Sequence, residues 1–263
     1  MQRVGDWSAT GRIGLQHDVG EDAMVYGQAS RGYKSGGFSN NTCNNQYAPE
    51  TVNAFEIGVK SQFMDRRVTL NASAYYYDYS NVAVEQSTVT GTSVVNAPKS
   101  HVLGLDLDGR FQLTQWLSVD GNATFLKTAY DRFFSSGGVA YGDPDGTNLS
   151  GRRLNKAPGA SGTLGVNVDL PVGDGKLKFR GEGYFSGGYR LREYKSAIFR
   201  QKSYELFNAY LTYSPSDNID VRLFGKNLSK TDYLQGTVAA LAGANGVFNP
   251  PRTYGIELSV KTR

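Results

Sequence analysis

Alternation of apolar and polar side chains with a period of two runs along the whole chain. The stretch RVTLNASAYYYDYS, residues 67–80, shows it most clearly, because Val68, Leu70 and Ala72 alternate with Thr69 and Asn71. Successive side chains of a β-strand point to opposite faces, so this stretch predicts a strand with one apolar and one polar face. Similar alternation recurs near residues 12–16, 23–32, 54–60, 103–112, 117–125, 163–170, 177–182, 204–213, 219–226 and 254–261. The sequence therefore predicts an all-β chain of about eleven strands.

The composition favours a membrane barrel over a helical membrane protein or a soluble β-protein. No apolar run approaches the roughly 18 residues of a membrane helix, which excludes that kind of span. A transmembrane barrel needs only alternating segments of about ten residues, and the 32 glycines and 17 tyrosines are typical of one. The polar faces carry charges that a soluble core would not accept. They are Glu56, Lys60, Asp106, Arg110, Asp120, Arg180 and Glu182. A lumen that holds water or a plug would accept them.

The connections between the predicted strands alternate in length. Short turns are expected at residues 18–22, 64–67, 113–115, 171–175 and 215–218. Long loops are expected at residues 33–50, 87–97, 131–157, 187–202 and 229–250. Outer-membrane barrels show this alternation, with short periplasmic turns and long extracellular loops. The predicted fold is therefore an antiparallel up-and-down transmembrane β-barrel portion, whose sheet stays open like half of a wide barrel.

This orientation predicts where the aromatic side chains of residues 67–80 lie. The strand rises from a short turn, so Tyr76 is expected at the outer lipid interface. Tyr75, Tyr77 and Tyr79 have the opposite parity and are expected to line the mouth of the lumen. On the last strand, the same argument turns apolar side chains to lipid and polar ones to the lumen. The first set is Tyr254, Ile256, Leu258 and Val260, and the second is Glu257, Ser259 and Lys261.

The sequence offers little for catalysis, metal binding or nucleic-acid binding. The net charge of +4 is dispersed, so nucleic acid is not an expected partner. His17 and His101 are expected at opposite membrane edges, facing outward, which argues against a shared metal site. GDPDG at 142–146 lacks the further ligands of a calcium loop and is interpreted as a turn. Cys43 is the only cysteine, so no internal disulfide is expected. We expect that the chain binds no cofactor and no metal, and that it is not an enzyme.

Several segments together resemble the TonB-dependent outer-membrane receptors. They include the Pro-Glu-Thr and Glu-x-Gly-x-Lys elements of residues 47–63 and the Gly-Lys-Asn-Leu element of residues 204–234. The Pro-Pro-Arg-Thr-Tyr-Gly element of residues 249–263 completes the set. The resemblance implies energised uptake of a scarce nutrient across the outer membrane of a Gram-negative bacterium. A ferric siderophore, cobalamin or a glycan would be the ligand.

The resemblance also implies a domain assignment. Receptors of this class have about 22 strands around a plugged lumen, twice the number expected here. Residues 1–263 therefore look like the C-terminal half of the barrel domain, with plug domain, TonB box and signal peptide absent. Outer-membrane lipid is an expected partner, and the TonB complex would be reached only through the plug.

Two other functions remain open from the sequence. A smaller closed barrel could act as a passive pore, which an even strand count and two periplasmic termini would favour. An outer-membrane hydrolase would need a Ser–His or Asp–His pair, which the expected positions of the histidines disfavour.

Ligand recognition, if the chain retains it, is expected at long loops and mouth-facing aromatic side chains. The candidates are Tyr33, Phe38, Tyr47, Tyr75, Tyr77, Tyr79, Phe133, Phe134 and Tyr141. Packing of these side chains within the loops is the alternative interpretation.

Overall fold

Eleven long strands form one antiparallel sheet in the computed structural model. The model describes residues 5, 7–39, 46–88, 91–134, 148–192, 194, 196–240 and 243–261. The strands are β1 (Gly11–Val19), β2 (Ala23–Lys34), β5 (Glu50–Phe63), β6 (Val68–Thr88), β7 (Gly91–Gln112), β8 (Leu117–Arg132), β9 (Ala160–Val172), β10 (Gly175–Ser186), β13 (Tyr204–Ser216), β14 (Ile219–Lys226) and β17 (Thr253–Val260). The predicted number of main strands is confirmed.

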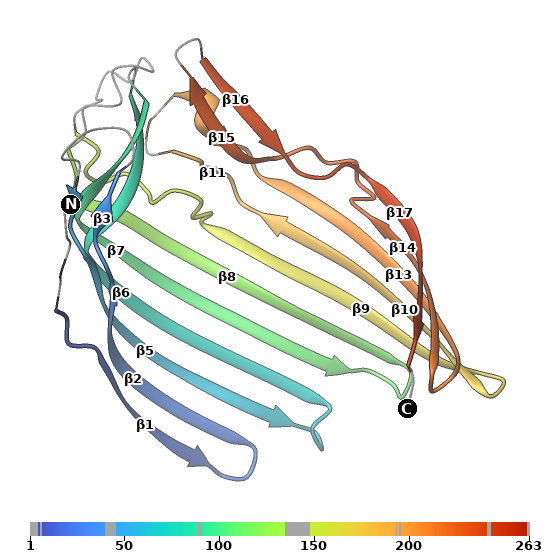
Figure 1. The fold of residues 1–263 in the computed structure, drawn as a ribbon. Coiled ribbons are helices and arrows are strands. Elements are labelled where there is room, and N and C mark those ends of the chain that lie inside the picture. Colours follow the sequence, from blue (N-terminus) through green and yellow to red (C-terminus); the bar gives the residue numbers. More distant parts are fainter. Residues whose placement is uncertain are drawn as a thin grey trace.

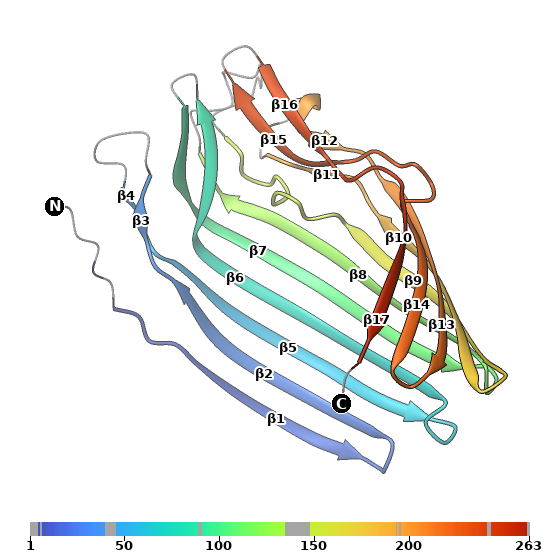
Figure 2. The same cartoon turned by 45° about the vertical axis from the view of Figure 1, so that its right-hand side comes forward.

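Each long strand lies beside its neighbours in the chain, in the order β1-β2-β5-β6-β7-β8-β9-β10-β13-β14-β17. Figures 1 and 2 show a curved, open sheet with β1 and β17 at its two edges. In the described residues β1 pairs with β2 and β17 pairs with β14, so the two edges do not close on each other. Both β1 and β17 run from the long-loop end of the sheet to the short-turn end. The sheet therefore begins at one end of the strands and finishes at the other.

The register sorts side chains onto two faces. Val59 lies opposite Ala72 and Ala72 opposite Leu107, so one apolar row crosses three strands. One residue further along, Lys60 lies opposite Asn71 and Asn71 opposite Asp108 on the other face. The apolar face is exposed, as Ile256 (74%) and Leu258 (66%) show. By register Leu258 lies opposite Val221 and Glu257 opposite Arg222, so the two sets predicted for β17 lie on different faces. An exposed apolar face of this extent is expected where lipid is the surrounding solvent.

Short hairpins occupy three of the long connections. They are β3 (Gly37–Phe38) with β4 (Gln46–Tyr47), β11 (Tyr189–Arg190) with β12 (Arg200–Gln201), and β15 (Leu234–Ala240) with β16 (Gly243–Phe248). The one described helical segment is a 3-10 turn at Ala197–Phe199. No helix among the described residues has the length and apolar character to cross a membrane.

The expectation of a long loop at residues 87–97 is wrong. β6 and β7 stay paired as far as Thr88 and Gly91, so only residues 89–90, outside the described ranges, connect them. The cause is visible in the sequence, because Val82 and Val84 continue the alternation and pair with Ala97 and Val95. β-Branched side chains favour such a paired, half-buried strand. The hairpin projects beyond the main sheet in Figure 1.

A small apolar core lies where this hairpin meets the β8–β9 connection. Val84, Ala97, Tyr130, Phe133 and Leu149 are all buried there. The rings of Tyr130 and Phe133 have centroids 5.0 Å apart. The loops at this end of the sheet are therefore packed against one another.

Candidate functional site

Three tyrosines of β6 form a ladder on the inner face at the long-loop end. The ring centroids of Tyr75 and Tyr77 lie 4.8 Å apart in a stacked arrangement, and those of Tyr77 and Tyr79 lie 6.4 Å apart edge to face. Gly104 of β7 makes room for this ladder, because a Cβ there would collide with the ring of Tyr75. Nearby, the hydroxyl of Tyr26 donates to Glu56 Oε1 at 2.6 Å. By register the three tyrosines of the ladder share the inner face of β6, which is the parity predicted from the sequence.

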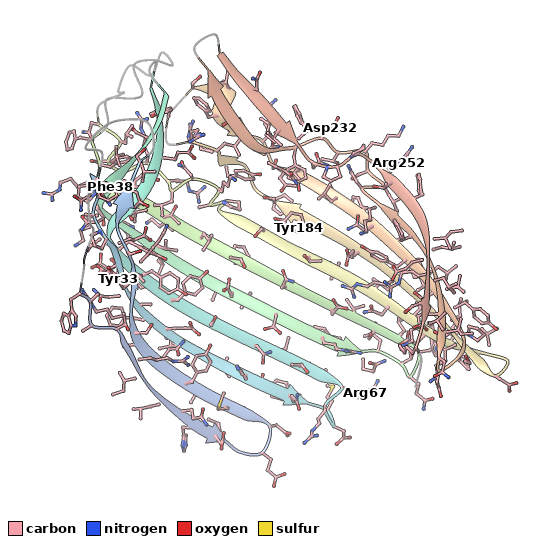
Figure 3. The ribbon with its side chains drawn as sticks, viewed as in Figure 1. Tyr33, Phe38, Arg67, Tyr184, Asp232 and Arg252 are labelled. Atoms are coloured by element: carbon pink, nitrogen blue, oxygen red, sulfur yellow. The ribbon has the colours of Figure 1, made fainter. Side chains whose placement is uncertain are left out.

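The structure separates the other predicted aromatic residues. By register Tyr33 shares the outer face with Thr51, whereas Gly32 shares the inner face with Tyr79. Figure 3 shows Tyr33 and Phe38 near the same edge of the sheet. Tyr47 lies against Gly37 in the β3–β4 hairpin. Phe133 is fully buried in the loop core, whereas Phe134 is 65% exposed. Tyr141 falls outside the described residues, and the ligand role of the whole set stays a prediction.

A second tyrosine cluster, which the sequence analysis missed, lies on the β10–β13 side. The rings of Tyr204 and Tyr233 stack with centroids 4.1 Å apart, and Tyr184 lies 6.0 Å from Tyr204. Tyr184, labelled in Figure 3, shares its face with Thr163 and therefore with the polar, inner side of the sheet. Burial raises the pKa of the Tyr189 phenol, and a hydrogen bond with Tyr204 lowers it in part. Strand parity could have identified Tyr184 and Tyr204, but not Tyr233, which lies in a loop.

Arg192 ties two loops together at the same end. Its guanidinium lies 3.3 Å from the Glu85 carboxylate and donates to the backbone oxygens of Glu85 and Thr237, each at 3.2 Å. The three residues line a cavity of about 360 Å³, together with Lys156. This cavity lies between the β6–β7 hairpin and the β15–β16 hairpin. No sequence signal pointed to Arg192, because its partners come from distant parts of the chain.

The inner face below these clusters carries a charged network centred on Arg180. Its guanidinium donates to both carboxylate oxygens of Asp120, at 2.8 and 3.1 Å, and to Glu182 Oε2 at 3.1 Å. Asn167 bridges the pair, since its side chain contacts both Arg180 and Asp120. Asn208 donates to the other oxygen of Glu182 at 3.0 Å. The sequence predicted charges on this face, and the structure shows how they are neutralised.

The histidines lie as expected on the outer face of distant strands. By register His17 lies opposite Val25 near a short turn, and His101 lies opposite Ala129 near a long loop. The structure adds an Asp–His contact that the sequence analysis did not predict, with Asp131 Oδ1 2.5 Å from His101 Nδ1. In the described ranges no serine or threonine hydroxyl bonds to His101, so the pair has no nucleophile beside it. No group of three or more candidate metal ligands occurs in the same ranges.

Comparisons with known proteins agree with this architecture. The chain is 21% identical to the pesticin receptor of Yersinia pestis, over 97% of this chain and 36% of that protein. It is 24% identical to the probable TonB-dependent siderophore receptor PiuA of Acinetobacter baumannii, over 76% of this chain and 26% of that protein. The fold is similar to that of the ferric yersiniabactin uptake receptor FyuA from Yersinia pestis, with a TM-score of 0.76 at 19% identity, covering 95% of this chain and 37% of that one.

The chain thus spans about a third of the length of curated relatives that it matches. These relatives are named as receptors, not as enzymes. The family described as TonB dependent receptor-like, beta-barrel matches residues 2–228. Because that match covers most of the chain, this protein belongs to the β-barrel family of TonB-dependent receptors.

Proposed function

We propose that residues 1–263 form the C-terminal half of the barrel domain of a TonB-dependent receptor in a Gram-negative outer membrane. Two observations support this assignment. The sheet has eleven strands with open edges, about half of the roughly 22 strands of such barrels. The chain also spans only 36% of the pesticin receptor that it resembles. Hydrocarbon does not tolerate unpaired sheet edges, so the two edge strands, β1 and β17, would find partners in the rest of the complete receptor.

We further propose that this receptor imports a scarce nutrient such as a ferric siderophore, with energy supplied through TonB. The observation that carries the proposal is the ladder of Tyr75, Tyr77 and Tyr79, which faces the inner space beneath packed loops. Stacked tyrosine rings offer large, rigid contact surfaces at a low cost in conformational entropy. TonB itself would contact a plug domain, so no residue of this chain is assigned to that contact. We propose no catalytic role for the chain.

The passive-pore alternative gains no support from the strand arrangement. A closed pore of this kind would need an even number of strands that begin and end at the same side of the membrane. The sheet has eleven strands, and β1 begins at the long-loop end whereas β17 ends at the short-turn end. The receptor assignment is therefore the function that the geometry favours.

Uptake of iron-55 carried by a panel of ferric siderophores tests the proposal in cells that express the complete receptor. Joint replacement of Tyr75, Tyr77 and Tyr79 with alanine is expected to weaken ligand binding on the order of a hundredfold, because three aromatic anchors that each contribute about 1 kcal/mol amount to about 3 kcal/mol. Tyr76→Ala is the matched control, since Tyr76 faces outward on the same strand and is 41% exposed.

Two results would contradict the proposal. Unchanged uptake in the triple variant would remove the tyrosine ladder from the ligand site. Uptake that persists in cells without TonB would contradict energised import. In both experiments the heat-modifiable mobility of the folded barrel confirms that the variant receptors reach the membrane in equal amounts.

A further inference from the structure

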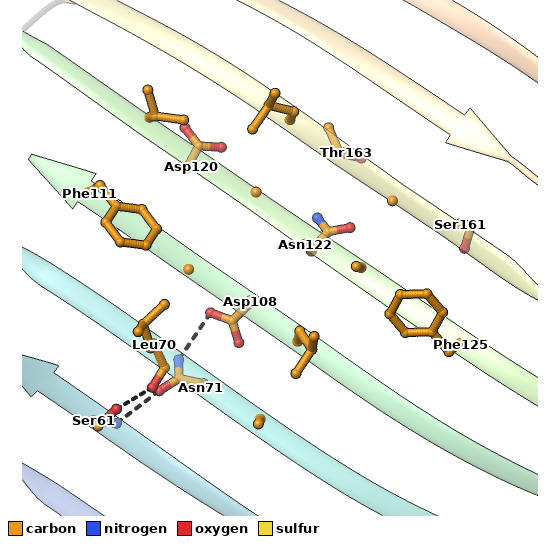
Figure 4. A pocket seen from close by; sticks show the side chains of 18 of the residues that line it. Ser61, Leu70, Asn71, Asp108, Phe111, Asp120, Asn122, Phe125, Ser161 and Thr163 are labelled. Atoms are coloured by element: carbon orange, nitrogen blue, oxygen red, sulfur yellow. Dashed lines mark hydrogen bonds between the residues drawn. The ribbon is translucent and has the colours of Figure 1, made fainter.

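The outer face of the sheet carries a groove, although lipid-facing strands usually carry bulky side chains. The groove has a volume of about 970 Å³ and crosses the apolar sides of β5 to β10. Its floor is made by Gly109 beside Gly121 and by Ala123 beside Gly162, which the register pairs across β7, β8 and β9. Aromatic rings form its rims, with Phe111 towards the short turns and Phe125 towards the long loops. Figure 4 shows the two rings at either end of this stretch.

Close approach of the strands explains only part of this floor. A Cβ at Gly121 would meet the backbone oxygen of Thr163 at 2.9 Å, and one at Gly162 would meet that of Asn122 at 2.5 Å. Backbone packing therefore requires glycine at these two positions. A Cβ at Gly109 would be nearest to a side-chain atom, Leu70 Cδ2, at 3.1 Å. Ala123 has a Cβ, but its side chain ends at that atom, so the floor is low there as well. The width of the groove at Gly109 and Ala123 is therefore not a by-product of strand packing.

Polar groups near the floor belong to the other face. Asn71 Nδ2 donates to Asp108 Oδ2 at 3.0 Å, and both residues have the inner parity. The side chains that rim the groove are apolar, and several are well exposed, such as Leu164 (60%) and Phe125 (46%). An occupant of the groove would therefore gain dispersion contacts and no hydrogen bonds from these side chains.

A polar belt begins where the groove ends at the long-loop side. Lys127 follows Phe125 by two residues on the same face of β8 and lies opposite Leu103. Two residues further towards the long loops on the same face of β7 lies His101, and the centroid of its ring is 6.1 Å from that of Tyr76. His101 is paired with Asp131, but Lys127 is exposed and has no hydrogen bond or ion pair within the described residues. Among the described residues, an ammonium group without a partner thus stands at the long-loop end of the apolar groove.

We propose that the groove binds an acyl chain of an outer-leaflet lipid whose phosphate head group pairs with Lys127. The inference rests on the membrane location proposed above. The groove is continuous with the lipid-facing surface of the sheet, which favours lipid as its occupant. A flexible chain can also reach a floor between projecting rings. The flat side of a second barrel would rest on the rims of Phe111 and Phe125 and leave the floor empty.

Native mass spectrometry of the complete receptor in detergent tests the proposal, with palmitoyl-oleoyl phosphatidylglycerol and phosphatidylcholine added in equal amounts. Ala123→Phe fills the groove and is expected to lose one retained phosphatidylglycerol per receptor. Lys127→Gln is expected to lower the preference for phosphatidylglycerol about fivefold, the effect of one cation near an anionic head group. Ala209→Phe, on the outer face of β13 but away from the groove, and Lys34→Gln, on the inner face of β2, are the controls and should retain lipid as the wild type does.

Several outcomes would overturn the assignment. Equal lipid retention by the wild type and Ala123→Phe would remove the acyl-chain site. A wild-type dimer that Ala123→Phe abolishes would make a second copy the occupant. Displacement of phosphatidylglycerol by inorganic phosphate would reduce the site to a free-phosphate site. These measurements need no nutrient ligand, so lipid loss with normal siderophore uptake, or the reverse, separates this inference from the proposed function.

Discussion

Replacing Ile256 with arginine is expected to lower the free energy of unfolding of the complete receptor by about 2–4 kcal/mol. Ile256 lies on the outer face of β17 and is 74% exposed. It precedes Lys261, at the short-turn end, by five residues. At about 3.3 Å per residue and a tilt near 45°, that places it roughly 12 Å into an apolar band about 25 Å tall. An arginine there would stand close to the middle of the hydrocarbon, where its charge has no partner.

Two further variants on β17 make this prediction specific. Leu258→Arg lies nearer the membrane edge and should cost less than Ile256→Arg, because the penalty falls with distance from the midplane. Ser259→Arg points to the inner face, opposite Asp220, and should be nearly neutral. Urea titrations in lipid vesicles, with the folded fraction read from heat-modifiable mobility, measure all three. A cost at position 259 equal to that at 256 would show that the two faces of β17 are assigned wrongly.

Replacing Arg180 with methionine is expected to cost about 2–3 kcal/mol of stability, because hydrogen bonds to charged groups are worth about 1.5–3 kcal/mol. The substitution removes the two bonds to Asp120 and the bond to Glu182, and it leaves both carboxylates without this cation. The side chains of Arg180 and Asp120 are 34% and 33% exposed, so water screens part of the loss. Methionine is unbranched and apolar, so it replaces the aliphatic stem of the arginine while removing its charge.

Arg222→Met is the matched control for this network. Arg222 also faces inward and pairs with Glu257 at 3.5 Å, but their side chains are 46% and 54% exposed. Exposed ion pairs contribute about 0–1 kcal/mol, so this variant should unfold close to the wild type. Equal urea midpoints for Arg180→Met and Arg222→Met would contradict the structural importance of the Arg180 network.

Local sequence patterns predict the parts of this structure that depend on neighbouring residues. The alternation at Val68, Leu70 and Ala72 is sufficient to predict a two-faced strand, and the same reasoning predicts the faces of β17. The short turns follow from glycine and polar residues between alternating segments, so neighbouring strands pair in chain order. The same logic, applied to Val82 and Val84, would have extended β6 and avoided the incorrect long loop.

Contacts between distant loops could not be predicted in this way. Arg192 meets Glu85 and Thr237, and nothing in the sequence near Arg192 indicates either partner. The difference between Phe133, buried, and Phe134, 65% exposed, depends on how the β8–β9 connection folds back onto Leu149. An aromatic side chain in a loop therefore indicates a candidate ligand contact, but only the packing decides whether it is accessible.

A nitroxide scan of residues 69–76 on β6 tests most directly the claim that this sheet spans a membrane with one face in lipid. Single cysteines are introduced into the complete receptor after Cys43, the only cysteine of this chain, has been replaced with serine. Collision rates with oxygen, which concentrates in lipid, should peak at Leu70, Ala72, Ala74 and Tyr76. A water-soluble nickel chelate should collide preferentially with labels at the positions between them. Oxygen maxima at Asn71, Ser73 and Tyr75, or equal values at all eight positions, would contradict the account.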